Sequence, residues 1–133
     1  MFNRLANAHN KFQDLIAFPR TLVVCSAGML RSPSISWVVG NDPYNRNSRA
    51  AGCVDEYALI PVDQVLLEWA DEIICAEDDH KDMVKVMMKE FEIENKPIYS
   101  LNIPDSFKYR DIRLIKLIKE KLEEVEFPKY KGT

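Results

Sequence analysis

Apolar residues recur along this chain in two alternating patterns, short runs and stretches with helical spacing. The short runs predict β-strands at residues 21–24, 49–52, 72–76 and 97–101. The helical spacing predicts helices at residues 33–39, 61–70, 78–91 and 106–125. Alternation of strand and helix is typical of a parallel sheet covered on both faces. We therefore expect an α/β fold: a single-domain three-layer sandwich with a four-stranded parallel sheet.

The same spacing predicts which helix faces point inward. Residues 3–17 place an apolar face on an extra N-terminal helix that would pack on the sheet or on a partner: Leu5, Ala8, Phe12, Leu15 and Ile16. Later helices contribute the following predicted core positions: Val62, Val65, Leu66 and Trp69, then Met83, Met87 and Met88, then Ile112, Ile115, Leu117, Ile118 and Leu122.

The turn after the first strand carries a pattern that points to chemistry. Its sequence is Cys25-Ser26-Ala27-Gly28-Met29-Leu30-Arg31-Ser32-Pro33, so five residues separate a thiol from a guanidinium. Backbone amides of residues 26–31 and of the next helix turn can converge on one anion. Gly28 can adopt the left-handed conformation that turns amides inward. The turn therefore predicts a phosphate-binding loop.

Arg31 and the helix N-terminus would activate the cysteine. A guanidinium can bind two phosphate oxygens at once and stabilise charge in a transition state. The same positive charge should favour the Cys25 thiolate, which can attack phosphorus. Ser32 could donate to the sulfur, or it could cap the helix that Pro33 begins. The cysteine could instead be a small core residue, because buried cysteines commonly are.

Asp105 is the candidate proton donor for a departing ester oxygen. It follows the last predicted strand, where ligand-binding loops of parallel sheets lie. Local sequence alone favours a helix N-cap for it, ahead of the helix expected from Ser106. Phe107 and Tyr109 flank this position and could bind an aromatic leaving group or pack the loop.

These residues together resemble the low-molecular-weight protein tyrosine phosphatase family, in particular its short bacterial-type members. The resemblance covers residues 21–122 and includes weaker matches at residues 50–52 and 69–74. It implies Cys25 as nucleophile, Ser32 as its partner and Asp105 as general acid. It also implies that Arg31 and residues 26–30 bind phosphate, with Phe107 and Tyr109 beside the substrate.

The resemblance implies an enzyme that hydrolyses aryl phosphate monoesters, with protein phosphotyrosine as substrate class. We expect the chain to consist of a helical extension at residues 1–20, the phosphatase-like domain at residues 21–126 and a loose tail at residues 127–133. Many members have asparagine where Gly28 stands and a second cysteine where Leu30 stands. The missing cysteine excludes a protective disulfide inside the loop.

The composition limits the cellular compartments and the binding partners that we expect for this protein. With a net charge of −3 and no basic stripe, the chain is not expected to bind nucleic acid. No apolar run approaches the roughly 20 residues of a membrane span, and the first residues do not form a signal peptide. Three cysteines without paired spacing indicate a reducing compartment, so we expect a cytoplasmic protein with Cys53 and Cys75 structural.

The histidine and cysteine pattern also bears on cofactors. Only His9 and His80 are present, with neither a His-Glu-x-x-His nor a Cys-x-x-Cys motif, so we expect no metal and no other cofactor. Two other functions remain open. An arsenate reductase of the same fold would relay oxidation through closely spaced cysteines, whereas Cys53 and Cys75 are far apart in sequence. A noncatalytic phosphate- or phosphopeptide-binding module would need neither Cys25 nor Asp105.

Overall fold

Strands and helices alternate along the whole described chain. The computed structural model describes residues 19–26, 31–53, 60–104 and 111–129. The elements follow in this order: β1 (Arg20–Cys25), α1 (Arg31–Val39), β2 (Asn47–Gly52), α2 (Gln64–Trp69), β3 (Glu72–Cys75), α3 (Asp78–Glu90), β4 (Ile98–Ser100) and α4 (Ile112–Glu124). The predicted four-stranded α/β fold is confirmed, with small shifts at the element ends.

The sheet is parallel throughout and has the strand order β2-β1-β3-β4. Within it, Cys25 pairs with Gly52 on one side, and Val24 pairs with Cys75 on the other. The chain leaves β1 toward β2 and then crosses over to β3, so the direction of winding changes between β1 and β3. In open parallel sheets, ligands bind beyond the carboxyl ends of the strands at such a switch point.

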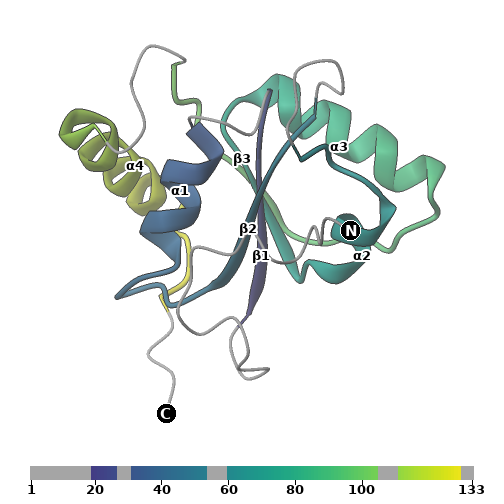
Figure 1. Cartoon of the computed structure of the whole chain (residues 1–133), viewed down its shortest axis with the longest axis horizontal. Helices are drawn as coiled ribbons and strands as arrows, with labels where there is room; N and C mark the ends of the chain where they lie inside the picture. The colour runs from purple at the N-terminus through teal and green to yellow at the C-terminus, as the bar shows by residue number, and fades with distance from the viewer. Residues whose placement is uncertain (1–18, 27–30, 54–59, 105–110, 130–133) are drawn as a thin grey trace.

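Helices cover both faces of the sheet in two layers (Figure 1). The helices α1 and α4 pack on one face, over a core that includes Val23, Ile35 and Ile118. The helices α2 and α3 pack on the other face, over Leu22, Leu66 and Val84. Successive β1 side chains therefore enter opposite cores, which explains why β1 is almost continuously apolar.

Three helices begin at positions different from the predicted ones, and the last of them, α4, begins at Ile112 instead of residue 106. The first helix starts at Arg31, so Pro33 is its third residue, where the missing proline N–H is tolerated. The second starts at Gln64, because Asp63 is its N-cap and accepts a hydrogen bond from the Leu66 amide at 3.0 Å. Pro61 instead forms a parallel bridge with Gly52.

Three predicted core positions are wrong. Ile112 is 84% exposed and Val65 is 53% exposed, while Met83 is also exposed. In α2 and α3 the inward positions are instead Leu66 and Val84, each one residue later and fully buried. Leu114 takes the inward position at the start of α4. Among the remaining predicted positions, Met88, Ile118 and Leu122 are buried as expected.

Some predictions at the chain ends lie outside the described residues. These are the leading helix at 3–17 and residues 130–133 of the tail. The prediction of a loose tail does not apply to Phe127. This side chain is buried and packs against Tyr44 and Tyr99, with ring centroids 5.6 and 5.1 Å away. Tyr44 is thereby a packing residue, buried away from solvent.

A buried ion pair closes the amino-terminal end of the sheet. Arg46 Nε donates to Glu72 Oε1 at 2.5 Å, and Thr21 Oγ1 donates to the same oxygen at 2.8 Å. The Arg46 guanidinium also donates to the Pro128 carbonyl and lies 4.5 Å from the Phe127 ring centroid. These contacts hold the segment after α4, which contains Phe127 and Pro128, against the amino ends of β1 and β3.

Candidate active site

Cys25 is the last residue of β1 and lies at the carboxyl end of the sheet. Its side chain is buried, and its Sγ donates to Ser32 Oγ at 3.1 Å. Ser32 is the second residue of α1, so it does not cap that helix, and its hydroxyl faces the sulfur. Of the two roles open for Ser32, the structure therefore supports the contact with the thiol.

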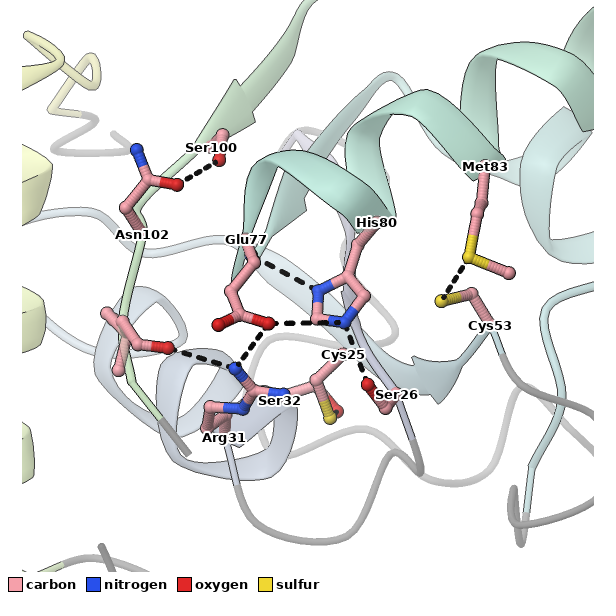
Figure 2. Close-up of polar contacts among 11 residues, drawn as sticks. Cys25, Ser26, Arg31, Ser32, Cys53, Glu77, His80, Met83, Ser100 and Asn102 are labelled. Carbon is pink, nitrogen blue, oxygen red and sulfur yellow. Dashed lines mark hydrogen bonds and ion pairs between the residues drawn. The ribbon is translucent and has the colours of Figure 1, made fainter. Parts of the chain in front are cut away.

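Arg31 begins α1 and is only 3% exposed. Its guanidinium Nη1 donates to the Ile103 carbonyl at 2.9 Å and lies 3.1 Å from Glu77 Oε2. Figure 2 shows the guanidinium beside Glu77, next to Cys25 and Ser32. A buried arginine needs such partners, because an unpaired buried charge is costly.

The partners of Arg31 come from the ends of two other strands. Glu77 follows β3 and stands just before α3, while Ile103 follows β4. The Ile103 amide donates to the Ala76 carbonyl at 2.8 Å, which holds the β4 exit beside the β3 exit. Carboxyl ends of parallel strands meet at one edge of a sheet, so residues far apart in sequence gather around Cys25 and Arg31.

Ser26 lies next to Cys25 and has a partner on α3. Its Oγ is 2.9 Å from His80 Nε2, while His80 Nδ1 accepts the Glu77 backbone N–H at 3.1 Å. The imidazole is buried, with 3% of its surface exposed. The candidate site therefore includes Glu77 and His80, which the sequence analysis did not assign to it.

A signal for these two residues was present in the sequence. The segment Glu77-Asp78-Asp79-His80 directly follows a predicted strand, and the fold class places strand exits together. Glutamate and histidine three residues apart also fit the first turn of a helix. What the sequence did not give is the strand order that makes β3 the neighbour of β1.

Several predicted site residues lie outside the described residues. These are Ala27, Gly28, Met29, Leu30, Asp105, Phe107 and Tyr109. The N-cap of α4 is Asp111, whose carboxylate accepts the Arg113 amide at 2.9 Å, so the helix that Asp105 was expected to cap begins later. A cavity of about 320 Å³ opens beside the strand exits and is lined by Glu77, Asp78, Asp79, Asn102 and Pro104.

The other two cysteines lie on the opposite face of the sheet from Cys25. Cys53 and Cys75 belong to the core under α2 and α3, whereas Cys25 belongs to the core under α1 and α4. Burial, together with the nearby Cys53, raises the pKa of the Cys75 thiol to about 12. Cys53 Sγ contacts Met83 Sδ at 3.6 Å. Both thiols are placed as packing groups.

Within the described ranges, no group of three or more His, Cys, Asp or Glu side chains is arranged to hold a metal ion. None of the described helices has the length and apolar character that crossing a bilayer requires.

Comparison with solved structures identifies the fold. YwlE arginine phosphatase from Geobacillus stearothermophilus superposes with a TM-score of 0.50 over 81% of this chain and 93% of that chain, at 19% sequence identity. This chain has the low-molecular-weight protein tyrosine phosphatase fold. In that fold, the site around Cys25 occupies the carboxyl edge of the sheet. No family model and no curated protein matches the sequence.

Proposed function

We propose that this protein is a phosphatase that hydrolyses phosphate monoesters through a cysteinyl-phosphate intermediate. The observation that carries the proposal is the position of Cys25 Sγ, 3.1 Å from Ser32 Oγ and beside the buried Arg31, at the switch point of the sheet. This proximity of a thiol, a hydroxyl and a guanidinium supports the proposed roles of nucleophile, stabiliser of its anion and bidentate phosphate ligand.

The proposed reaction has two steps. The Cys25 thiolate attacks phosphorus, the bond from phosphorus to the ester oxygen breaks, and Asp105 gives its proton to the departing oxygen. Asp105 then accepts a proton from water as that water attacks phosphorus, and the sulfur–phosphorus bond breaks to release phosphate and the thiolate. Arg31 and the amides of residues 26–31 hold the phosphoryl oxygens in both steps, and Ser32 donates to the sulfur anion.

Support for Asp105 comes from its neighbours in the chain. Ile103, two residues before it, accepts a hydrogen bond from Arg31 at 2.9 Å. Pro104, directly before it, lines the cavity at the strand exits together with Glu77 and Asn102. The segment that leads to Asp105 therefore begins next to the Arg31 guanidinium, which would hold the phosphate.

The proposed substrates are aryl phosphates, with phosphotyrosine in proteins as the physiological class. An aryl leaving group is consistent with Phe107 and Tyr109 close to Asp105 in sequence. Because the neighbour in fold is named an arginine phosphatase, the substrate panel should contain phosphoarginine beside phosphotyrosine, phosphoserine and phosphothreonine peptides. Ranking by kcat/KM would then assign the substrate class.

The covalent step is tested with a chromogenic aryl phosphate. We expect a burst of phenol release when formation of the intermediate is faster than its hydrolysis, and Cys25→Ser should abolish turnover. Cys53→Ala is the matched control, because it removes another buried thiol that faces the opposite core. Turnover by Cys25→Ser at the rate of the parent protein would exclude the covalent route.

The general acid is tested with a series of leaving groups. We expect Asp105→Asn to lower kcat by about 10²- to 10⁴-fold for esters of weakly acidic phenols and much less for esters of strongly acidic phenols, because the latter need no proton to depart. A loss that is the same for every leaving group would assign Asp105 a structural role instead.

The arsenate reductase alternative needs a disulfide relay. Cys25 faces the core under α1 and α4, whereas Cys53 and Cys75 face the core on the other side of the sheet, so neither of the two thiols faces Cys25. Arsenate reduction through an internal cysteine relay should therefore give no activity, whereas a binding module would retain phosphate affinity and show no hydrolysis.

A further inference from the structure

The first turn of α3 contacts both ends of the segment that forms the proposed phosphate-binding loop. Glu77 pairs with Arg31 at one end, and His80 contacts Ser26 at the other. Figure 2 shows these two side chains reaching the loop ends from the same helix end. Since Ser26 directly follows Cys25, a group that fixes Ser26 also restrains the backbone next to the nucleophile.

The hydrogen bonds of His80 define which ring nitrogen carries the proton. The Glu77 backbone N–H can only donate, so His80 Nδ1, at 3.1 Å from that nitrogen, accepts and is unprotonated. The neutral ring then has its hydrogen on Nε2, which donates to Ser26 Oγ at 2.9 Å. Glu77 Oε2 is farther from Nε2, at 3.9 Å. The imidazole therefore has one accepting and one donating contact with defined partners.

Restraint from outside the loop matters because of its sequence. Gly28 has no side chain with which to hold the loop and has the largest conformational freedom of any residue. His80 is buried and its ring is oriented by the backbone of its own helix, so it can act as a rigid support. Binding of an oxyanion by backbone amides depends on such preorganisation, because the amides must converge before the ligand arrives.

We propose that His80 is a positioning residue that orients Ser26, and through it the phosphate-binding loop, for oxyanion binding and transfer. This inference rests on the proposed function, because the proposed function is what makes residues 26–31 a phosphate-binding loop. In this proposal His80 makes no contact with substrate. The effect of His80 should therefore pass through the Ser26 hydroxyl.

Two substitutions separate the contact with Ser26 from the contact with α3. The amide nitrogen of His80→Gln can reach the position of Nε2 and donate to Ser26, whereas the shorter His80→Asn can replace only Nδ1 and accept the Glu77 amide. His80→Ala loses both contacts. Val84→Ala, one turn further along α3 and fully buried, is the matched control for lost packing.

Phosphate affinity provides a readout that does not depend on catalysis. Inorganic phosphate is titrated into each variant in a Cys25→Ser background by calorimetry, and kcat/KM is measured in the background with Cys25. We expect His80→Asn and His80→Ala to weaken phosphate binding by about tenfold, as loss of one hydrogen bond predicts, and His80→Gln to stay within about threefold of the parent. Val84→Ala should lower the melting temperature and leave phosphate affinity unchanged.

A double-mutant cycle with Ser26→Ala tests the route. We expect His80→Ala to add little to the loss already caused by Ser26→Ala. Equal affinity of His80→Ala and Val84→Ala, failure of His80→Gln to restore binding, or full additivity with Ser26→Ala would each overturn the inference. Phosphate binding without turnover in the parent would contradict only the proposed function, whereas no phosphate binding by the parent would overturn both.

Discussion

Three thiols lie near the carboxyl edge of one small sheet, and their surroundings give them different chemistry. Cys25 faces Ser32 at the start of α1, while Cys75 is fully enclosed in the core under α2 and α3. Desolvation by burial is the main cause that raises the pKa of Cys75 to about 12, and the nearby Cys53 adds to it. A cysteine in such a setting packs like an apolar residue.

Alkylation should distinguish these thiols. At pH 8, a pKa of about 12 leaves roughly one Cys75 in 10⁴ as thiolate, so iodoacetamide should not modify Cys75 in the folded protein. Peptide mass spectrometry after labelling should find Cys75 modified only when urea is present. Rapid labelling of Cys75 in the folded protein would contradict its enclosed position.

At the scale of single residues, the sequence predicted the parts of the site that lie within one turn. Cys25, Arg31 and Ser32 are separated by a few positions, so their proximity follows from local geometry. Glu77 and His80 are about fifty positions away, and their contacts depend on the order of the strands. Spacing along the chain contains no information on that order, which explains why the sequence assigned neither residue to the site.

Helix α4 shows how element boundaries decide which residues are buried. The apolar spacing predicted an inward face that included Ile112, but the helix begins at Ile112 with Asp111 as its N-cap. Leu114, Ile118 and Leu122 then form the buried stripe, four residues apart. The period was predicted correctly, whereas the start of the helix was not, because its N-cap is Asp111.

Substitutions on α4 should separate the two kinds of position. We expect Ile118→Ala to lower the free energy of unfolding by about 2–5 kcal/mol, because it leaves a cavity between α4 and the sheet. Ile112→Ala should change it by less than about 0.5 kcal/mol, because that side chain is almost fully exposed. Urea unfolding followed by tryptophan fluorescence gives both values. Similar losses for the two variants would place Ile112 in a packed environment.

At the scale of the whole molecule, the two ends of the sheet have different roles. The carboxyl end carries the proposed chemistry, and the amino end carries the buried pair of Arg46 and Glu72 with Phe127 packed over it. The two features lie at opposite ends of the same strands. Stability and catalysis therefore depend on separate sets of side chains in one compact unit.

Removing one partner of the buried pair should be costly. We expect Arg46→Met to lower the free energy of unfolding by about 3–5 kcal/mol, because the buried Glu72 loses its cationic partner. The double variant Arg46→Met/Glu72→Leu should recover part of this loss. For both, kcat per folded molecule should stay at the parent value at low temperature. A large loss of kcat with unchanged stability would show that the two ends are coupled.

A second pair at the amino end should make stability depend on pH. Burial alone would raise the pKa of Asp71, but hydrogen bonds from Arg20, at 2.9 Å from the backbone and 3.2 Å from the guanidinium, outweigh it and lower that pKa below 3.8. A carboxyl group with a lowered folded-state pKa adds stability above its unfolded pKa and loses it as the pH falls through the folded value.

The pH effect can be measured with one substitution. Because the pair is half exposed, we expect Asp71→Asn to cost less than about 1 kcal/mol at pH 7, and the difference from the parent should shrink as the pH falls below 3.8. Asp82→Asn, on the exposed face of α3, is the control. A deficit of Asp71→Asn that persists unchanged at pH 2 would assign it to lost packing instead of charge.

Because Phe127 and Pro128 cover Arg46, the last described residues of the chain are part of the packed fold. Shortening the chain at Glu126 would uncover a buried cation at the end of the molecule away from Cys25. The shortened protein would be degraded quickly after synthesis, yet the molecules that remain folded would turn over substrate normally. A screen that scores only activity in cells would then report a catalytic defect in a segment that takes no part in catalysis.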